Sequence, residues 1–167
     1  MRKRTKQTES IGDYIKLRGC LEYELKDASN NRVIRHERHD NLVVTVGRRW
    51  VLEKINATNN QTNAINSIAV GTDTTAAASN DTKLGSELTA TVGRKTCGFD
   101  TTNLTSGTPN WMATVQFATD QATGTIGEAG LFNTSSATAG TMFSRVVFTT
   151  FSKATSNTLS ISYTVSN

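Results

Sequence analysis

The side chains best suited to chemistry in this chain stand in one short stretch, His36-Glu-Arg-His39-Asp40. Histidines and carboxylates ligate metal ions and carry protons. On an extended strand, however, residues three positions apart point to opposite faces, so His36 and His39 cannot readily share one ion. Nearby arginines, which would repel a cation, are Arg32, Arg35 and Arg38. We therefore expect a solvated, charged strand face here, and neither a metal nor another cofactor.

No motif brings together the residues needed for covalent catalysis. Serine and threonine are abundant, with 28 threonines in 167 residues, but neither histidine accompanies a nucleophile turn. Cys97, in Thr-Cys-Gly-Phe, lacks a catalytic signature, and a buried thiol is favoured. The simplest interpretation of Cys20 and Cys97 is that both are free thiols in a reducing cytoplasm. A disulfide between them remains an alternative. We predict that the chain is not an enzyme.

One carboxylate has an unusual setting, because Glu128 lies between Gly127 and Ala129 in an apolar segment. A catalytic carboxylate would need a partner acid, and the sequence places none beside it. We favour a buried structural ion pair, with Arg145 or Arg94 as the alternative partners.

The C-terminal region contains three strand-like segments, which include Glu128 and Arg145 and would fix their positions. They are residues 126–132, 141–149 and 158–165. In the last segment Leu159, Ile161, Tyr163 and Val165 alternate with serine and threonine. This period of two indicates a strand with one buried and one solvated face. The solvated face carries hydroxyls rather than charges, which suits a surface that lies against another protein.

The rest of the chain is also predicted to consist mainly of strands. The expected elements are strands over 15–25 and 32–39 joined by a turn, a helix over 44–56, and strands over 65–70, 88–95 (the weakest pattern) and 111–117. Val46, Trp50 and Lys54 share one side of this helix, with Val51 and Ile55 beside them, as in a helix laid on a sheet. Glu53 and Lys54 are expected to be exposed. Trp50 and Trp111 occupy apolar positions of their patterns and are predicted to anchor the core.

These elements predict a mainly β fold: an antiparallel β-sandwich of jelly-roll or Ig-like topology with one short α-helix. We expect a single β-sandwich domain over residues 14–167, preceded by a flexible basic arm over residues 1–13. A chain of this length fits one domain.

The positive charge is concentrated near the N-terminus. Residues 1–54 hold 13 lysines and arginines against 8 acidic residues, whereas residues 55–167 hold 5 against 6. The arm contributes Arg2, Lys3, Arg4 and Lys6, which make it a candidate for docking on an acidic partner, although a merely solvated tail is the other interpretation. Nucleic acid is a weaker candidate because the basic residues do not continue as a stripe. No run of 18 apolar residues suggests a membrane span.

Several short motifs occur in a recognisable order. They are Asn41-Leu-Val-Val-Thr-Val-Gly-Arg-Arg-Trp-Val-Leu, Ile68-Ala-Val-Gly-Thr-Asp-Thr-Thr-Ala-Ala, Gly127-Glu-Ala-Gly-Leu-Phe-Asn133 and Met142-Phe-Ser-Arg-Val-Val-Phe. This order, over about residues 41–165, resembles small structural proteins of tailed bacteriophages.

The resemblance implies a non-enzymatic virion protein, assembled in the host bacterial cytoplasm. A capsid decoration (cement) protein is favoured: a homotrimer that binds the major capsid protein, or another virion protein, and stabilises the capsid exterior. Many decoration proteins lack the helix-bearing segment, so a tail or head fibre or a baseplate adaptor remains an alternative. A carbohydrate-binding β-sandwich module that uses Trp50 or Trp111 is another.

Overall fold

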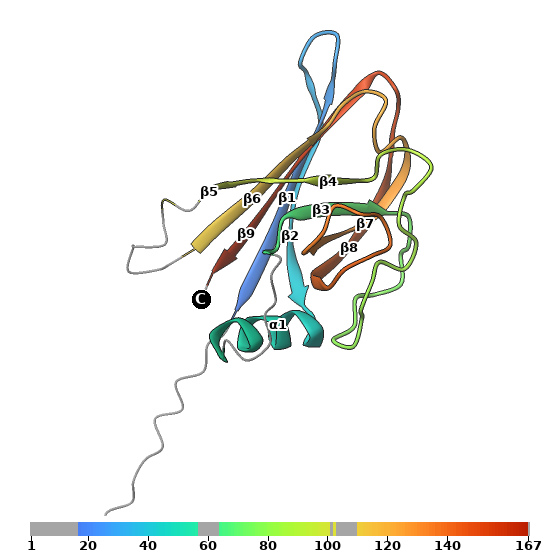
Figure 1. Ribbon diagram of the computed structural model, residues 1–167. Coiled ribbons are helices and arrows are strands. Elements are labelled where there is room, and N and C mark those ends of the chain that lie inside the picture. Colours follow the sequence, from blue (N-terminus) through green and yellow to red (C-terminus); the bar gives the residue numbers. More distant parts are fainter. Residues whose placement is uncertain (1–16, 57–63, 101, 103–109, 167) are drawn as a thin grey trace, which may run out of the picture.

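The computed structural model describes residues 17–56, 64–100, 102 and 110–166 (Figure 1). The predicted basic arm, with Arg2, Lys3, Arg4 and Lys6, lies outside the described residues. The elements are β1 (Arg18–Asp27), β2 (Val33–Val43), α1 (Thr45–Asn56), β3 (Ser67–Gly71), β4 (Arg94–Thr96), β5 (Gly98–Asp100), β6 (Asn110–Phe117), β7 (Gly124–Phe132), β8 (Met142–Lys153) and β9 (Asn157–Ser166).

The strands of the described residues form one antiparallel sheet in the order β4-β3-β7-β8-β2-β1-β9-β6-β5, and this sheet is nearly closed into a barrel. The prediction of a mainly β, antiparallel fold with a short α-helix is confirmed. The predicted two-sheet sandwich of jelly-roll or Ig-like topology is not confirmed, because all the strands belong to this single sheet.

The barrel is nearly closed by a short extended segment around Cys97. On one side of this residue β4 pairs with β3, and on the other side β5 pairs with β6, so residues 94–100 link the two ends of the strand order. The pairing between β2 and β8 is also short, since it joins only Leu42 with Arg145 and Val43 with Ser144. The sheet therefore has two halves: β3, β7 and β8 with β4, and β2, β1, β9 and β6 with β5.

The strand expected over residues 88–95 is wrong for most of its length. Only Arg94 and Lys95 belong to a strand, β4. The Leu88 N–H donates to the carbonyl of Val70, and the Val70 N–H donates to the carbonyl of Gly93. Because both ends of the stretch are tied to Val70, residues 88–93 must turn back instead of extending.

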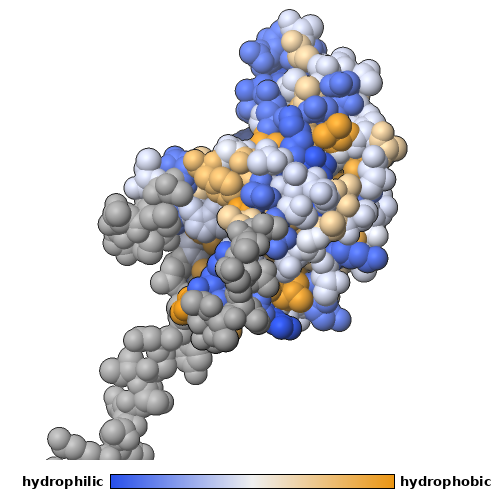
Figure 2. All heavy atoms as spheres, viewed as in Figure 1, coloured by the Kyte–Doolittle hydropathy of each residue, from blue (hydrophilic) through white to orange (hydrophobic). Residues whose placement is uncertain are grey.

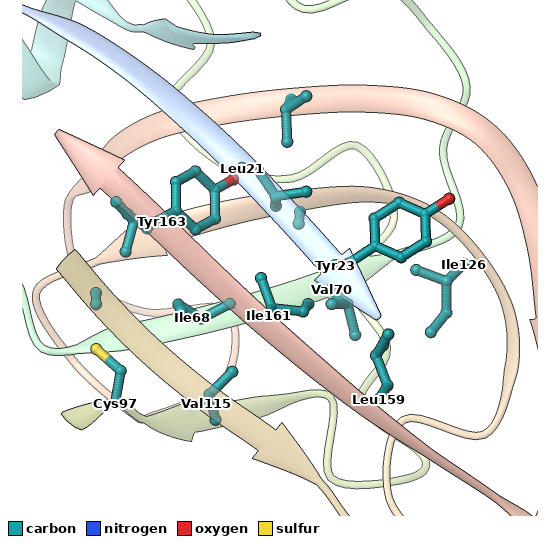
Figure 3. Close-up of a cluster of buried hydrophobic side chains, with 14 of the residues drawn as sticks. Leu21, Tyr23, Ile68, Val70, Cys97, Val115, Ile126, Leu159, Ile161 and Tyr163 are labelled. Atoms are coloured by element: carbon teal, nitrogen blue, oxygen red, sulfur yellow. The ribbon is translucent and has the colours of Figure 1, made fainter. Parts of the chain in front are cut away.

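The interior is lined by the alternating apolar residues that the sequence indicated. Leu159, Ile161 and Tyr163 of β9 are at most 2% exposed. They lie beside Leu21 and Tyr23 of β1 and face the interior side of β3 (Figure 3). The predicted buried face of the C-terminal strand is therefore confirmed.

The helix α1 packs on β8, and Gly47 sets its rotation. A Cβ atom at this position would lie 2.1 Å from the Phe143 carbonyl oxygen, so only glycine allows the contact. Val46 and Trp50 are partly buried, as predicted, but Ile55 is 66% exposed, and the Glu53 side chain is only 17% exposed. The helix is thus rotated about its axis relative to the prediction, with Gly47 held against the backbone of Phe143.

Both tryptophans pack against the core, but neither is fully buried. Trp50 meets Phe143 edge-on at a centroid distance of 6.4 Å, and Trp111 meets the same ring at 6.3 Å. Each is partly buried beside the main core cluster. Their predicted anchoring role is consistent with these contacts.

Candidate functional site

The carboxylate that the sequence singled out, Glu128 of β7, is fully buried on the outer side of the sheet. Its Oε2 atom accepts a hydrogen bond from Nε of Arg145 at 2.9 Å, which confirms the predicted ion pair and selects Arg145 over Arg94. The backbone N–H groups of Gly85 and Ser86 also donate to this carboxylate, at 3.0 and 2.8 Å. Glu128 therefore binds a loop as well as an arginine.

Arg145 joins three carboxylates from separate parts of the chain. Besides Glu128, its guanidinium contacts Asp81 at 2.8 Å and Asp73 at 2.9 Å. The pKa of Asp73 is lowered by the N–H and hydroxyl of Thr75 and by Arg145. Burial alone would raise the pKa of Asp81, but the Ala78 N–H and Arg145 lower it overall. This cluster fastens residues 73–86 onto β7 and β8.

A second buried ion pair joins Arg94 to Glu87, and sequence reasoning missed it. Two guanidinium nitrogens of Arg94 donate to the Glu87 carboxylate at 2.7 Å, and the two side chains are only 2% and 6% exposed. The third nitrogen donates to backbone carbonyls of residues 134, 136 and 139. The guanidinium also lies 3.7 Å from the centre of the Phe132 ring. The only signal in the sequence was that the two charged residues flank residues 88–93, which were wrongly predicted to be part of a strand.

A small second core completes this covering. It consists of Val44, Ala69, Leu84, Phe132 and Met142. Leu84 belongs to the segment that the charge cluster holds, so apolar contacts and ion pairs act on the same loop. Residues 73–87 therefore cover the outer face of β3, β7 and β8 around Glu128, Arg145 and Phe132.

Among the residues that the structure describes, none forms such a cover of buried side chains over the outer face of the other half. On β9, the outward residues Ser160, Ser162 and Thr164 are all partly exposed. Register places Ser162 between Glu22 of β1 and Thr114 of β6. We call this surface, formed by the outward side chains of β2, β1, β9 and β6, the open face.

Side chains on the open face are paired both between neighbouring strands and along a single strand. His36 Nε2 and Glu22 Oε1 are 2.6 Å apart, and Lys26 contacts Glu24 at 2.6 Å. Gln116 Nε2 donates to Ser160 Oγ at 3.4 Å. The charges thus gather on β1 and β2, while β9 and β6 present mostly hydroxyl and amide groups.

The two histidines lie on opposite faces of β2, as their spacing predicted. His36 is exposed on the open face, whereas His39 points inward and stacks against both Tyr23 and Phe148, at centroid distances of 6.0 and 5.4 Å. His39 also contacts Glu37 at 2.9 Å. In the described part of the chain, no group of three His, Cys, Asp or Glu side chains is arranged to hold a metal ion.

Both cysteines are free thiols, which decides between the two alternatives left by the sequence. Cys20 is partly exposed on the open face, and its sulfur lies 2.8 Å from Nε of Arg38. Cys97 is buried, and burial raises the pKa of its thiol to about 11. The predicted buried thiol at position 97 is therefore confirmed.

Comparison with known proteins gives no further assignment. No protein-family model matches the chain, and no curated protein or solved structure matches it either. Within the described residues, no helix has the length and apolar character needed to cross a lipid bilayer.

Proposed function

We propose that this chain is a non-enzymatic structural protein of a tailed-bacteriophage virion, most simply a capsid decoration protein. The observation that carries this proposal is the open face, which offers a broad protein-binding surface on a rigid sheet. The order of motifs over about residues 41–165 supports the placement among virion proteins. The proposed partner is the major capsid protein or another virion protein.

The chemistry of the open face suits contact with a second copy of the chain. Serine and threonine side chains are short, so ordering them in an interface costs less conformational entropy than ordering lysine or glutamate. Glu22 already contacts His36 and Glu24 already contacts Lys26 within the face, so these two carboxylates keep a partner when the face is covered. We therefore assign the open face to subunit contacts in a homotrimer.

The buried charges support a structural role rather than catalysis. Glu128 and Arg145 bond to each other and to the 73–86 loop, and Arg94 and Glu87 bond to each other and to the 134–139 loop. Each of these groups holds a loop against the sheet. Such a rigid scaffold presents the same surface to every partner.

The basic arm, with Arg2, Lys3, Arg4 and Lys6, stays a proposed docking segment. Its positive charge suits an acidic capsid exterior, and salt should weaken that attraction. A nucleic-acid role remains less favoured because the basic residues of the open face stand among the carboxylates Glu22, Glu24 and Asp40 and form no continuous stripe.

Mass spectrometry of purified particles from the phage that encodes this chain tests the proposal. A decoration protein should be present at a fixed copy number per particle, close to that of the major capsid protein. A copy number far below that of the major capsid protein would instead favour the fibre or baseplate-adaptor role. Absence from the particles, with the protein found only in the soluble fraction of the lysate, would overturn the virion assignment.

An exposed aromatic ring favours the carbohydrate-binding alternative. Phe99 of β5 is 46% exposed, and its ring lies 5.9 Å from that of Trp111. Exposed rings of this kind can stack on the apolar face of a sugar. Glycan-array binding that disappears in Phe99→Ala, with the melting temperature unchanged, would support this second function.

A further inference from the structure

One side of α1 carries apolar side chains away from the sheet. Residues 48, 52 and 55 lie on the same side of a helix because they are four and seven positions apart. Leu52 and Ile55 are 65% and 66% exposed, and Arg48 beside them is exposed as well. We call these three residues the α1 stripe. Because Gly47 is held against β8, the helix cannot rotate to bury the stripe.

A small hollow adjoins the stripe. It has a volume of about 170 Å³ and is lined by Leu17, Arg48, Val51 and Leu52. An apolar cavity of about 150 Å³ can hold a benzene-sized group. The hollow therefore has room for one apolar side chain from a docked protein.

The charges around the stripe indicate the chemistry of that protein. Exposed or partly exposed charged residues on α1 and at the adjoining ends of β1 and β2 are Arg18, Arg48, Arg49 and Lys54 on the basic side and Asp40 and Glu53 on the acidic side. The surface is thus basic overall. Figure 2 shows hydrophobic and hydrophilic side chains next to each other at the lower edge of the molecule, where α1 lies. Two copies facing each other through this surface would repel, whereas an acidic surface would be attracted.

We propose that the α1 stripe docks on an acidic protein surface of the virion that inserts an apolar side chain beside Leu52. This inference rests on the proposed function, and it assigns the attachment surface within it. Helices commonly bind through apolar anchors spaced three, four and seven residues apart, and here the anchors are Leu52 and Ile55 with Arg48 supplying the charge. The open face is then left for contacts between copies.

The test uses particles purified from a phage in which this reading frame is interrupted, with purified protein added back and binding measured by co-sedimentation. We expect Leu52→Glu and Ile55→Glu each to weaken the Kd by at least about tenfold, since each removes an apolar anchor and adds a repelling charge. Arg48→Glu should also weaken binding and reduce its dependence on salt.

Two exposed residues outside both α1 and the open face provide matched controls. Val92 is 51% exposed and its carbonyl accepts a hydrogen bond from the Ala122 N–H, so Val92→Glu makes the same chemical change away from the stripe. Arg32, in the turn before β2, is exposed, so Arg32→Glu matches Arg48→Glu. Both controls should bind like the wild type. Circular dichroism melting should confirm that every variant is folded, and Leu52→Ser and Ile55→Ser replace any variant that is not.

The outcomes separate this inference from the proposed function. If the wild-type protein does not bind the particles, the proposed function itself fails. If the wild type binds and the stripe variants bind equally well, only the assignment of the stripe is overturned. Loss of self-association in Leu52→Glu would show that a second copy covers the stripe, and this result would also overturn the proposal.

Discussion

The two halves of the sheet place the same kinds of charged side chain in opposite environments. On the covered half, Arg145 and Glu128 are 3% and 0% exposed and join a loop to the strands. On the open face, the side chains of His36 and Glu22 are 52% and 51% exposed and bridge only neighbouring strands. Burial decides the consequence: a buried charge that loses its partner is costly, whereas an exposed pair contributes little. The buried ion pairs therefore stabilise the covered half, whereas the surface of the other half is available for contacts with other proteins.

Arg145→Met should have the largest effect, because it leaves the fully buried Glu128 without its cation. We expect a loss of about 3–5 kcal/mol in the free energy of unfolding, measured by urea denaturation. Arg49→Met is the control, since Arg49 is 74% exposed in its pair with Glu53, and it should cost at most about 0.5 kcal/mol. Equal effects of the two variants would contradict the distinction between the two environments.

Trp111→Ala tests the interior of the open half. The ring contacts Phe143 and Phe99 but is only partly buried, so we expect a loss of about 3 kcal/mol, at the lower end for a large aromatic. Thermal and urea unfolding measure the loss. An unchanged stability together with lost sugar binding would instead support the carbohydrate-binding alternative.

Acid should weaken the covered half through Asp73 and Asp81. Their pKa values are lowered in the folded protein, so their contribution to stability is present above the pKa of an unfolded aspartate, about 3.9. It is lost as the pH falls through their lower folded values. Urea unfolding at pH 7 and pH 3 should show the loss, and Arg145→Met should show a smaller one. An equal acid effect in both proteins would contradict the role of Arg145.

Ser162→Lys should have the smallest effect on stability, because Ser162 is only partly buried at the centre of the open face. We expect a change within about 0.5 kcal/mol. The same substitution places a long charged side chain in the proposed subunit contact. A large loss of monomer stability would show that the open face belongs to the scaffold rather than to an interface.

Local patterns of the sequence predicted much of the fold. The alternation in residues 158–165 and the hairpin of β1 and β2 are confirmed because each depends on a repeating local pattern. The burial of Glu128 in an ion pair was also predicted, since a lone carboxylate in an apolar strand needs a cation, but the sequence left Arg145 and Arg94 as alternative partners.

The remaining features depend on contacts between distant parts of the chain. The near closure of the barrel uses two strands of three residues each, β4 and β5, which are too short for a recognisable period. The Arg94–Glu87 pair and the placement of Leu84 depend on how residues 72–93 fold back over the sheet. The rotation of α1, which leaves Ile55 exposed, involves the close approach of Gly47 to Phe143 of β8. None of these is encoded in a local pattern.

The mass of the protein in solution tests the central claim, that the open face is an interface between copies, most directly. Multi-angle light scattering after size exclusion, at tens of micromolar protein, should give three times the chain mass of 18.1 kDa for the wild type. Ser162→Lys should shift the mass toward that of one chain without unfolding it. A wild-type protein that remains at 18.1 kDa, or a trimer that Ser162→Lys leaves intact, would contradict this assignment of the open face.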